Sequence, residues 1–256
     1  MDERFAGIDR LYGAGSAARL ARAHVAVVGL GGVGSWAAEA LARSGVGELT
    51  LIDADEVCVS NTNRQAHALE GEYGRAKVEV VARRLRAINP ELHVNALAEF
   101  VTSASLVALM ERGYDAVIDA CDALRIKVDM IAFCRRRKIP VIVSGSAGGR
   151  RDPTLITSRD LSKTEHDILL GLVRKKLRDE YGWTRNRKRY FGVQAVFSRE
   201  NVNYPQADGS VCKTRPADAA GAFKLDCSGG LGAAMHVTAT FGMVAAARTI
   251  ERVLDA

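Results

Sequence analysis

The chain has little cysteine and no paired cysteine motif. Its 256 residues include 5 cysteines, and no two of them form a C-x-x-C pair. Structural zinc sites are typically built from such pairs, so we expect no zinc. An odd number of scattered cysteines is typical of a reducing compartment, and residues 1–4 do not read as a secretory signal. We therefore expect a cytoplasmic protein in which Cys58, Cys121 and Cys134 are inert core thiols.

Long hydrophobic runs are also absent. The longest apolar stretch, residues 233–247, is shorter than the roughly 20 residues that a membrane span needs, and it contains His236. We do not expect it to cross a membrane. Instead it predicts a long terminal helix over 231–253, packed on a sheet or on a second subunit. The small residues Ala239, Gly242 and Ala246 would allow a close approach.

Aromatic residues are few, at 6%, and positive charge is in excess, with 36 Lys and Arg against 30 Asp and Glu. A net charge of +6 favours a polyanionic partner. The basic run at 185–189 lies between Trp183 and Tyr190, and cations beside aromatic rings suit RNA phosphates and bases. A second run at 135–138 ends a predicted helix, where cations also complement the helix dipole, so its role stays open.

The most informative segment that is present is the glycine-rich run V-A-V-V-G-L-G-G-V-G at 25–34. Its four leading apolar residues predict a buried parallel strand. Gly29, Gly31 and Gly34 form the G-x-G-x-x-G pattern, which is typical of a turn that binds phosphate at a helix N-terminus. Asp53 follows at the end of the next predicted strand, where a carboxylate can accept hydrogen bonds from ribose hydroxyls. The pattern predicts a nucleotide site without saying which nucleotide.

Two cationic residues and a further acidic residue follow this run, and they indicate which kind of reaction the nucleotide site would serve. An enzyme that cleaves ATP between its α- and β-phosphates needs cations for the leaving pyrophosphate and a carboxylate for Mg²⁺. We expect Arg64, Lys77 and Asp122 to be catalytic, with Asp122 as the metal ligand. A nicotinamide-binding module would have no use for Arg64 and Lys77 aimed at phosphates, so that alternative is disfavoured.

The apolar pattern predicts an α/β fold with a doubly wound, mostly parallel sheet and a site at the carboxyl ends of the strands. Strands are expected at 24–29, 48–53, 92–98, 115–119 and 139–144, alternating with helices at 33–44, 72–88, 103–112 and 124–137. Strands at 154–157 and 192–197 would extend the sheet, with a helix at 168–181 between them. We divide the chain into a nucleotide-binding region, 1–149, and a substrate and dimerisation region, 150–256, of the same domain. Segment 203–226 is expected to be a mobile loop over the site.

Five motifs together resemble the adenylation domain of the ubiquitin-activating-enzyme superfamily, a Rossmann-like fold. They are G-L-G-G-V-G at 29–34, D-A-D at 53–55, N-T-N-R-Q at 61–65, Lys77, and D-A-C-D at 119–122. The resemblance implies ATP and Mg²⁺ as cofactors. It assigns the phosphates to the glycine loop with Arg64 and Lys77, the ribose to Asp53, and the metal to Asp122. The candidate ATP-binding residues are Gly29, Gly31, Gly32, Gly34, Asp53, Asp55, Asn61 and Arg10.

Motifs outside that core resemble one branch of the superfamily, the tRNA threonylcarbamoyladenosine dehydratases. They are R-L-Y-G at 10–13, Y-P-Q-A-D-G-S-V-C at 204–212, D-C-S-G-G-L-G-A-A at 226–234 and T-A-T-F-G at 238–242. This resemblance implies ATP-dependent cyclisation of the modified adenosine next to the anticodon of tRNA, through a carboxyl-adenylate. It also implies a homodimer, with a sulfur-relay protein as a further partner.

Three points stay open at this stage. The alternative activity is adenylation of the C-terminal carboxylate of a ubiquitin-like sulfur carrier, which the missing zinc cysteines and the basic second half disfavour. The superfamily's N-terminal R-x-x-R-Q signature is broken here, so either Arg4 or Arg10 would reach ATP across a dimer. Cys227 lies beside a glycine turn that could stabilise a thiolate, although dehydration needs no covalent thioester.

Overall fold

The fold is built on a seven-stranded sheet with the order β3-β2-β1-β4-β5-β7-β6. The structure is a computed structural model, and it describes residues 3–206, 208–214 and 231–255. The strands are β1 (His24–Val28), β2 (Glu48–Ile52), β3 (His93–Leu97), β4 (Ala116–Asp119), β5 (Val141–Ser144), β6 (Ile156–Asp160) and β7 (Gln194–Ser198). Every neighbouring pair is parallel except β6 with β7. The predicted doubly wound, mostly parallel sheet and its C-terminal extension are confirmed.

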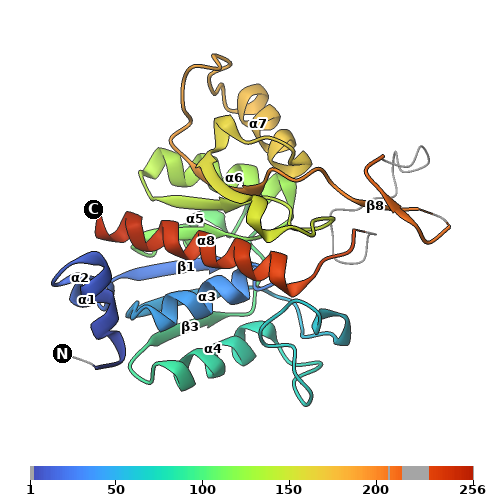
Figure 1. Ribbon diagram of the computed structural model, residues 1–256. Helices are drawn as coiled ribbons and strands as arrows, with labels where there is room; N and C mark the ends of the chain where they lie inside the picture. The colour runs from blue at the N-terminus through green and yellow to red at the C-terminus, as the bar shows by residue number, and fades with distance from the viewer. Residues whose placement is uncertain (1–2, 207, 215–230, 256) are drawn as a thin grey trace.

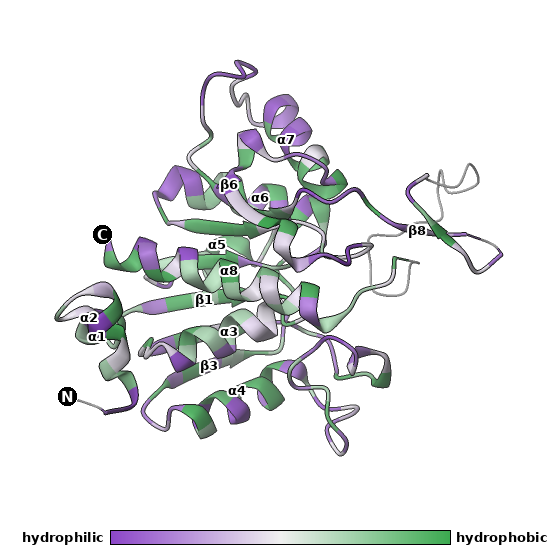
Figure 2. Cartoon of the chain, viewed as in Figure 1, coloured by the Kyte–Doolittle hydropathy of each residue, from purple (hydrophilic) through white to green (hydrophobic). Residues whose placement is uncertain are grey.

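Helices cover both faces of this sheet (Figure 1). One face carries α3 (Gly34–Arg43), α4 (Lys77–Ile88) and α8 (Met235–Leu254), and the other carries α5 (Leu106–Met110), α6 (Leu124–Arg137) and α7 (Ile168–Glu180). Alternation along the central strand separates the two cores. Val25 and Val27 face the first set of helices, whereas Ala26 and Val28 face the second. Figure 2 shows the apolar residues concentrated on the strands and on the inner sides of the helices.

The terminal helix α8 packs directly on α3. A Cβ atom at Gly242 would lie 2.5 Å from the carbonyl oxygen of Val33, so this contact requires glycine. Val237, Phe241 and Ala245 of the same helix are buried in the core. The predicted long terminal helix, with a close approach at Gly242, is confirmed. Among the residues that the structure describes, no helix is long and apolar enough to cross a membrane.

Several boundaries differ from the predictions for local reasons. Helix α4 begins at Lys77 and not at residue 72, because Gly74 adopts a φ of +80° and Ala76 bridges to Glu56. Strand β6 begins at Ile156 and not at residue 154, because the Asp152 carboxylate caps a 3-10 turn over Pro153–Leu155. Helix α8 starts at residue 235 and not at 231.

Other differences concern the first 23 residues, segment 203–226 and one cysteine. The first 23 residues contain α1 (Ala6–Tyr12) and α2 (Ser16–Leu20), which the apolar pattern did not predict. Within segment 203–226 the structure describes a hairpin of β8 (Tyr204–Pro205) and β9 (Val211–Cys212). Residues 207 and 215–230, and with them Cys227, lie outside the described residues. Cys134 is buried as expected, but the prediction for Cys58 was wrong, since this thiol is exposed.

Candidate functional site

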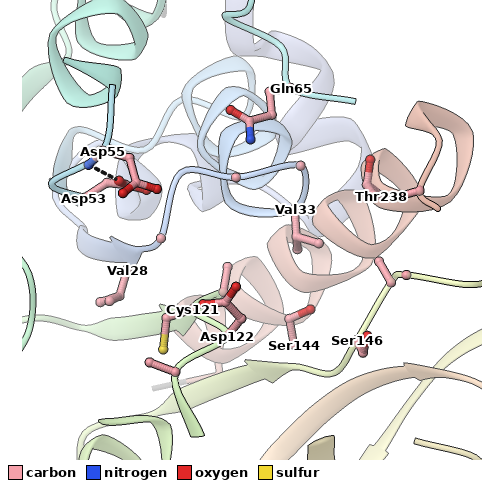
Figure 3. Close-up of a pocket in the computed structure, with 18 of the residues that line it drawn as sticks. Val28, Val33, Asp53, Asp55, Gln65, Cys121, Asp122, Ser144, Ser146 and Thr238 are labelled. Atoms are coloured by element: carbon pink, nitrogen blue, oxygen red, sulfur yellow. Dashed lines mark hydrogen bonds between the residues drawn. The ribbon is translucent and has the colours of Figure 1, made fainter. Parts of the chain in front are cut away.

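A cavity of about 460 Å³ opens at the carboxyl ends of the neighbouring parallel strands β1 and β4, from which the chain continues to opposite sides of the sheet. This is the point at which the strand order reverses, the usual ligand position in open α/β sheets. Figure 3 shows the glycine loop crossing the cavity, with Asp53 and Asp55 at one side and Asp122 and Ser144 on the opposite side. Gly29, Gly31 and Gly32 line the cavity.

Glycine is required by the geometry of this loop. Gly29 has a φ of +86°, and a Cβ atom there would lie 2.9 Å from the carbonyl group of Ala120. A Cβ atom at Gly34 would lie 1.8 Å from the carbonyl oxygen of Gly29. Gly34 does not line the cavity but lets α3 begin against the loop. The N-terminus of α3 therefore lies beside the loop, where the helix dipole favours a phosphate.

Asp53 is held rigidly at the end of β2. Its Oδ2 atom accepts a hydrogen bond from the backbone N–H of Leu30 at 2.6 Å, and its Oδ1 atom accepts one from Asp55 at 2.8 Å. The first bond joins the carboxylate to the glycine loop. This arrangement fixes the carboxylate beside the loop, where the remaining lone pairs face the cavity.

Lys77 is the first residue of α4, and its side chain is only 7% exposed. Its ammonium donates to Asp55 Oδ2 at 2.9 Å, which holds it at the cavity wall. His67 is fully buried nearby, and burial, with the charges of Lys77 and Arg84, lowers its pKa to about 4. The imidazole is consequently neutral at physiological pH and adds no positive charge beside Lys77.

Arg64 reaches the cavity from the loop that follows β2. Its Nη1 atom donates to the carbonyl of Ser60 at 2.8 Å and to Asn63 Oδ1 at 2.9 Å. Its own carbonyl accepts from the Trp36 indole at 2.9 Å and from the Thr238 hydroxyl at 3.4 Å. Helices α3 and α8 therefore both fix the backbone that carries this guanidinium.

Gln65 lies beside the glycine loop (Figure 3) and was not among the predicted site residues. It is 4% exposed, and neither its amide nitrogen nor its amide oxygen has a hydrogen-bond partner in the described part of the chain. A buried amide without a partner costs free energy unless a ligand satisfies it. The sequence signal was its position directly after Arg64 in the N-T-N-R-Q motif.

Asp122 and Cys121 follow β4 at the far wall of the cavity. Burial, followed by the neighbouring Asp119, raises the pKa of the Cys121 thiol well above its ordinary value. The Cys121 sulfur is therefore protonated and is no nucleophile. In the part of the chain that the structure describes, no cluster of three or more His, Cys, Asp or Glu side chains could hold a metal ion.

Besides Gly34, two predicted binding residues, Asn61 and Arg10, do not line the cavity. Asn61 is buried, and its Oδ1 atom accepts from the backbone N–H of Cys58 at 3.1 Å, so it shapes the turn before Arg64. Arg10 is exposed on α1, away from the cavity. Arg4 pairs with Glu91 at 3.4 Å and does not line the cavity either. The assignment of one of these arginines to a neighbouring subunit's ATP stays a prediction.

Known proteins resemble this chain over nearly its full length. The model of the ThiF family matches residues 6–253. The chain belongs to the ThiF family. It is 50% identical over 252 residues to the tRNA threonylcarbamoyladenosine dehydratase of Escherichia coli K12, which covers 98% of this chain and 94% of that protein. The family and branch that the motifs resemble are thus confirmed.

Solved structures and a more distant relative complete the comparison. The crystal structure of the E. coli dehydratase in complex with ATP matches this ThiF-family chain with a TM-score of 0.87 at 46% identity, covering 99% of this chain and 94% of that one. The E. coli molybdopterin-synthase adenylyltransferase is 38% identical over 123 residues, which is 48% of this chain and 49% of that protein. Similarity to the dehydratase therefore extends over nearly the whole chain, whereas similarity to this adenylyltransferase covers about half of it.

Proposed function

We propose that this ThiF-family protein is an ATP-dependent enzyme that dehydrates threonylcarbamoyladenosine in tRNA. The carboxylate of the modification attacks the α-phosphate of ATP, which forms an acyl-adenylate and releases pyrophosphate. A nitrogen of the same modification then attacks the activated carbonyl, expels AMP and closes a ring, with net loss of one water. The observation that carries the proposal is the 50% identity with the E. coli dehydratase over 98% of the chain, including its second half.

The cavity fits a nucleoside triphosphate on its own geometry. A Cβ atom at Gly29 or Gly34 would collide with backbone, so the loop has the close approach that a phosphate needs. The unpartnered amide of Gln65 and the ammonium of Lys77 lie in the same cavity wall. A relative that covers nearly the whole chain has been crystallised with ATP. These observations support ATP as the nucleotide.

Each cavity residue then has a task in the first step. The carboxylate of Asp53, already fixed by two backbone N–H groups, accepts hydrogen bonds from the ribose hydroxyls. Lys77 and Arg64 stabilise the negative charge that develops on the leaving pyrophosphate. Asp55 keeps the ammonium of Lys77 at 2.9 Å before the phosphates arrive.

Magnesium is proposed at Asp122. Mg²⁺ in ATP sites is usually held by one or two carboxylates together with phosphate oxygens, so a single acid at this wall suffices. When bound, the ion would neutralise phosphate charge during attack on the α-phosphate.

The second step depends on position more than on acid or base groups. Nucleophile and electrophile belong to one modified nucleoside, so their effective concentration is high once the adenylate forms. Ser144 ends β5 and Ser146 follows it, and Leu231 and Ala233 precede α8 at the same cavity. We assign this side of the cavity to the modified adenosine.

The partners follow from this reaction. We propose a homodimer in which Arg4 or Arg10 reaches the ATP of the neighbouring subunit. We also propose that region 1–149 holds ATP while 150–256 contacts tRNA and the second subunit. A tRNA substrate places the enzyme in the cytoplasm, and a sulfur-relay protein is a further proposed partner.

The proposal is tested by ATP–pyrophosphate exchange with three additions: tRNA carrying threonylcarbamoyladenosine, a ubiquitin-like sulfur carrier, and buffer alone. We expect exchange only with the modified tRNA, together with mass-spectrometric loss of one water from the nucleoside. Exchange that requires the carrier protein would assign the alternative adenylyltransferase activity. No exchange under any condition would reject adenylation altogether.

A further inference from the structure

A second pocket, of about 400 Å³, lies between the C-terminal half of α6 and the segment that follows α7. Its lining includes Arg135, Arg136, Tyr181, Trp183, Tyr190 and Phe191. None of these residues lines the ATP cavity. On α6 the two linings are closest at Ile126 and Ala132, which are six residues and thus a rise of about 9 Å apart.

Aromatic rings form one wall of this pocket. Trp183 and Phe191 pack edge to face, with ring centroids 4.8 Å apart and an interplanar angle of 90°. The backbone N–H of Trp183 donates to the carbonyl of Leu177 at 3.1 Å, which fixes this wall to the end of α7. Tyr190 is 70% exposed, and the Lys163 ammonium lies 5.0 Å from its ring centroid. The exposed Tyr190 ring is a surface on which a planar group can stack.

Unpaired positive charge surrounds these rings. Within the described residues, the exposed Arg136 makes no ion pair or hydrogen bond through its side chain. The side chains of Arg187, Lys188 and Arg189 also make no ion pair or hydrogen bond within the described residues. These residues lie in the loop between α7 and β7, and Figure 2 shows this loop as a hydrophilic segment that extends from the top of the molecule. Arg185 differs, because it pairs with Asp179 at 2.6 Å.

The fold therefore joins two basic runs that lie far apart in the sequence. Arg135 and Arg136 at the end of α6 line the aromatic pocket, and so do Thr184 and Tyr190, which flank residues 185–189 after α7. Arg135 links the two segments by donating from Nε to the carbonyl of Phe191 at 3.1 Å. Flat apolar surface beside unpaired cations is the complement of a nucleotide, which has a planar base and a charged phosphate.

We propose that this pocket binds an unstacked nucleotide of the tRNA, with its base on Tyr190 and Trp183 and its phosphates at Arg136 and residues 187–189. The inference rests on the proposed function, since it makes the pocket a second contact on the same RNA. The two linings come within a rise of about 9 Å of each other along α6, so one RNA chain can contact both. A second copy of this chain is a poorer occupant, because a symmetric contact would bring two positive patches together.

The test measures binding of an unmodified, fluorescently labelled anticodon stem-loop RNA by anisotropy over a series of salt concentrations. Tyr190→Ala should weaken binding about 5- to 150-fold, the range for one base stacked on an aromatic ring. Tyr190→Phe keeps the ring and should bind like the wild type. Arg136→Gln and Lys188→Gln should each flatten the slope of log affinity against log salt by about 0.7–0.9. Arg22→Gln, which removes an exposed and unpaired charge elsewhere in the described residues, is the matched control and should leave binding unchanged.

The same variants are assayed for dehydration of modified tRNA, where KM for tRNA should rise and ATP affinity should stay constant. If the wild type dehydrates modified tRNA but all variants keep its Kd, salt slope and KM, the pocket proposal is overturned while the function stands. If the wild type does not dehydrate tRNA but the variants lose RNA binding as stated, the function fails and the pocket is supported. A change of oligomeric state in Tyr190→Ala with unchanged RNA affinity would assign the patch to a second copy and also overturn the proposal.

Discussion

Lys127 donates from its ammonium to Asp119 Oδ1 at 2.8 Å, and neither side chain is exposed to solvent. Burial lowers the pKa of Lys127, but the Asp119 carboxylate outweighs it, so the pKa of this lysine is raised overall. The same Asp119 oxygen accepts from the backbone N–H of Cys121 at 3.3 Å. This buried ion pair therefore supports the chain segment that carries Asp122 at the cavity wall.

Removing one partner of the pair should destabilise the protein strongly. We expect Lys127→Met to lower the free energy of unfolding by about 3–5 kcal/mol, because it leaves the Asp119 carboxylate buried without its cation. Urea denaturation measures this loss. The double variant Lys127→Met/Asp119→Asn should recover part of it, and a single variant as stable as the wild type would contradict a charged pair.

Lys77→Ala and Arg64→Ala should each slow adenylation about 10²–10³-fold, since each removes a preorganised cation for the leaving pyrophosphate. ATP–pyrophosphate exchange in the presence of modified tRNA measures the effect. Arg83→Ala on the same helix is the control, because its guanidinium pairs with Glu72 and does not line the cavity. Normal turnover by a folded Lys77→Ala protein would rule out adenylation at this cavity.

Asp122→Asn keeps the shape of the side chain but removes the charge that would hold Mg²⁺. ATP should still bind through the glycine loop, while exchange becomes much slower at limiting Mg²⁺. A titration of exchange rate against Mg²⁺ concentration tests this expectation. Full activity at low Mg²⁺ would move the metal site elsewhere, with Asp55 as the first candidate.

Gln65→Leu should separate stability from ligand binding. The amide of Gln65 has no hydrogen-bond partner in the described residues, and burying such an amide costs about 1–3 kcal/mol. The substitution removes this cost. The free protein should therefore be as stable as the wild type or more stable in thermal unfolding. ATP should raise its Tm less than it raises that of the wild type, and an equal ATP-dependent shift would show that Gln65 does not contact the nucleotide.

His67 should make stability depend on pH below neutrality. Its pKa of about 4 in the folded state lies below the ordinary value of 6.5, so the unfolded chain binds the extra proton first. The contribution of His67 to the free energy of unfolding is fully present above pH 6.5. As pH falls from 6.5 towards 4, this contribution is lost, and the free energy of unfolding decreases by about 3 kcal/mol in total. His67→Leu should lose this part of the pH dependence in urea unfolding between pH 7 and 4.5, and parallel curves would contradict it.

Much of the fold and the cavity could be predicted because their signals are local. Gly29 and Asp53 each follow a strand directly, Asp122 comes shortly after β4, and the parallel arrangement brings these strand ends to one edge. Asn61 shows the limit of this reasoning, because its place in a motif does not reveal that its amide caps a turn.

Tertiary contacts account for what could not be predicted. Lys127 and Asp119 both belong to polar residue types that are rarely buried, and only the folded packing reveals that they pair. Arg135 and Arg136 meet Tyr190 and Phe191 in one pocket because of how the end of α6 packs against the segment after α7, and no local pattern encodes this.

The segment after the first strand and the beginning of the last helix meet in the ATP cavity. Gly29 follows β1, whereas Ala233 lies just before α8 and Thr238 in its first turn, and Asn63 Nδ2 donates to the carbonyl of Ala233 at 2.7 Å. During synthesis the glycine loop leaves the ribosome long before α8 does. The nascent chain therefore acquires its nucleotide site only when translation is nearly complete, so a ribosome that stalls before residue 235 releases an inactive protein.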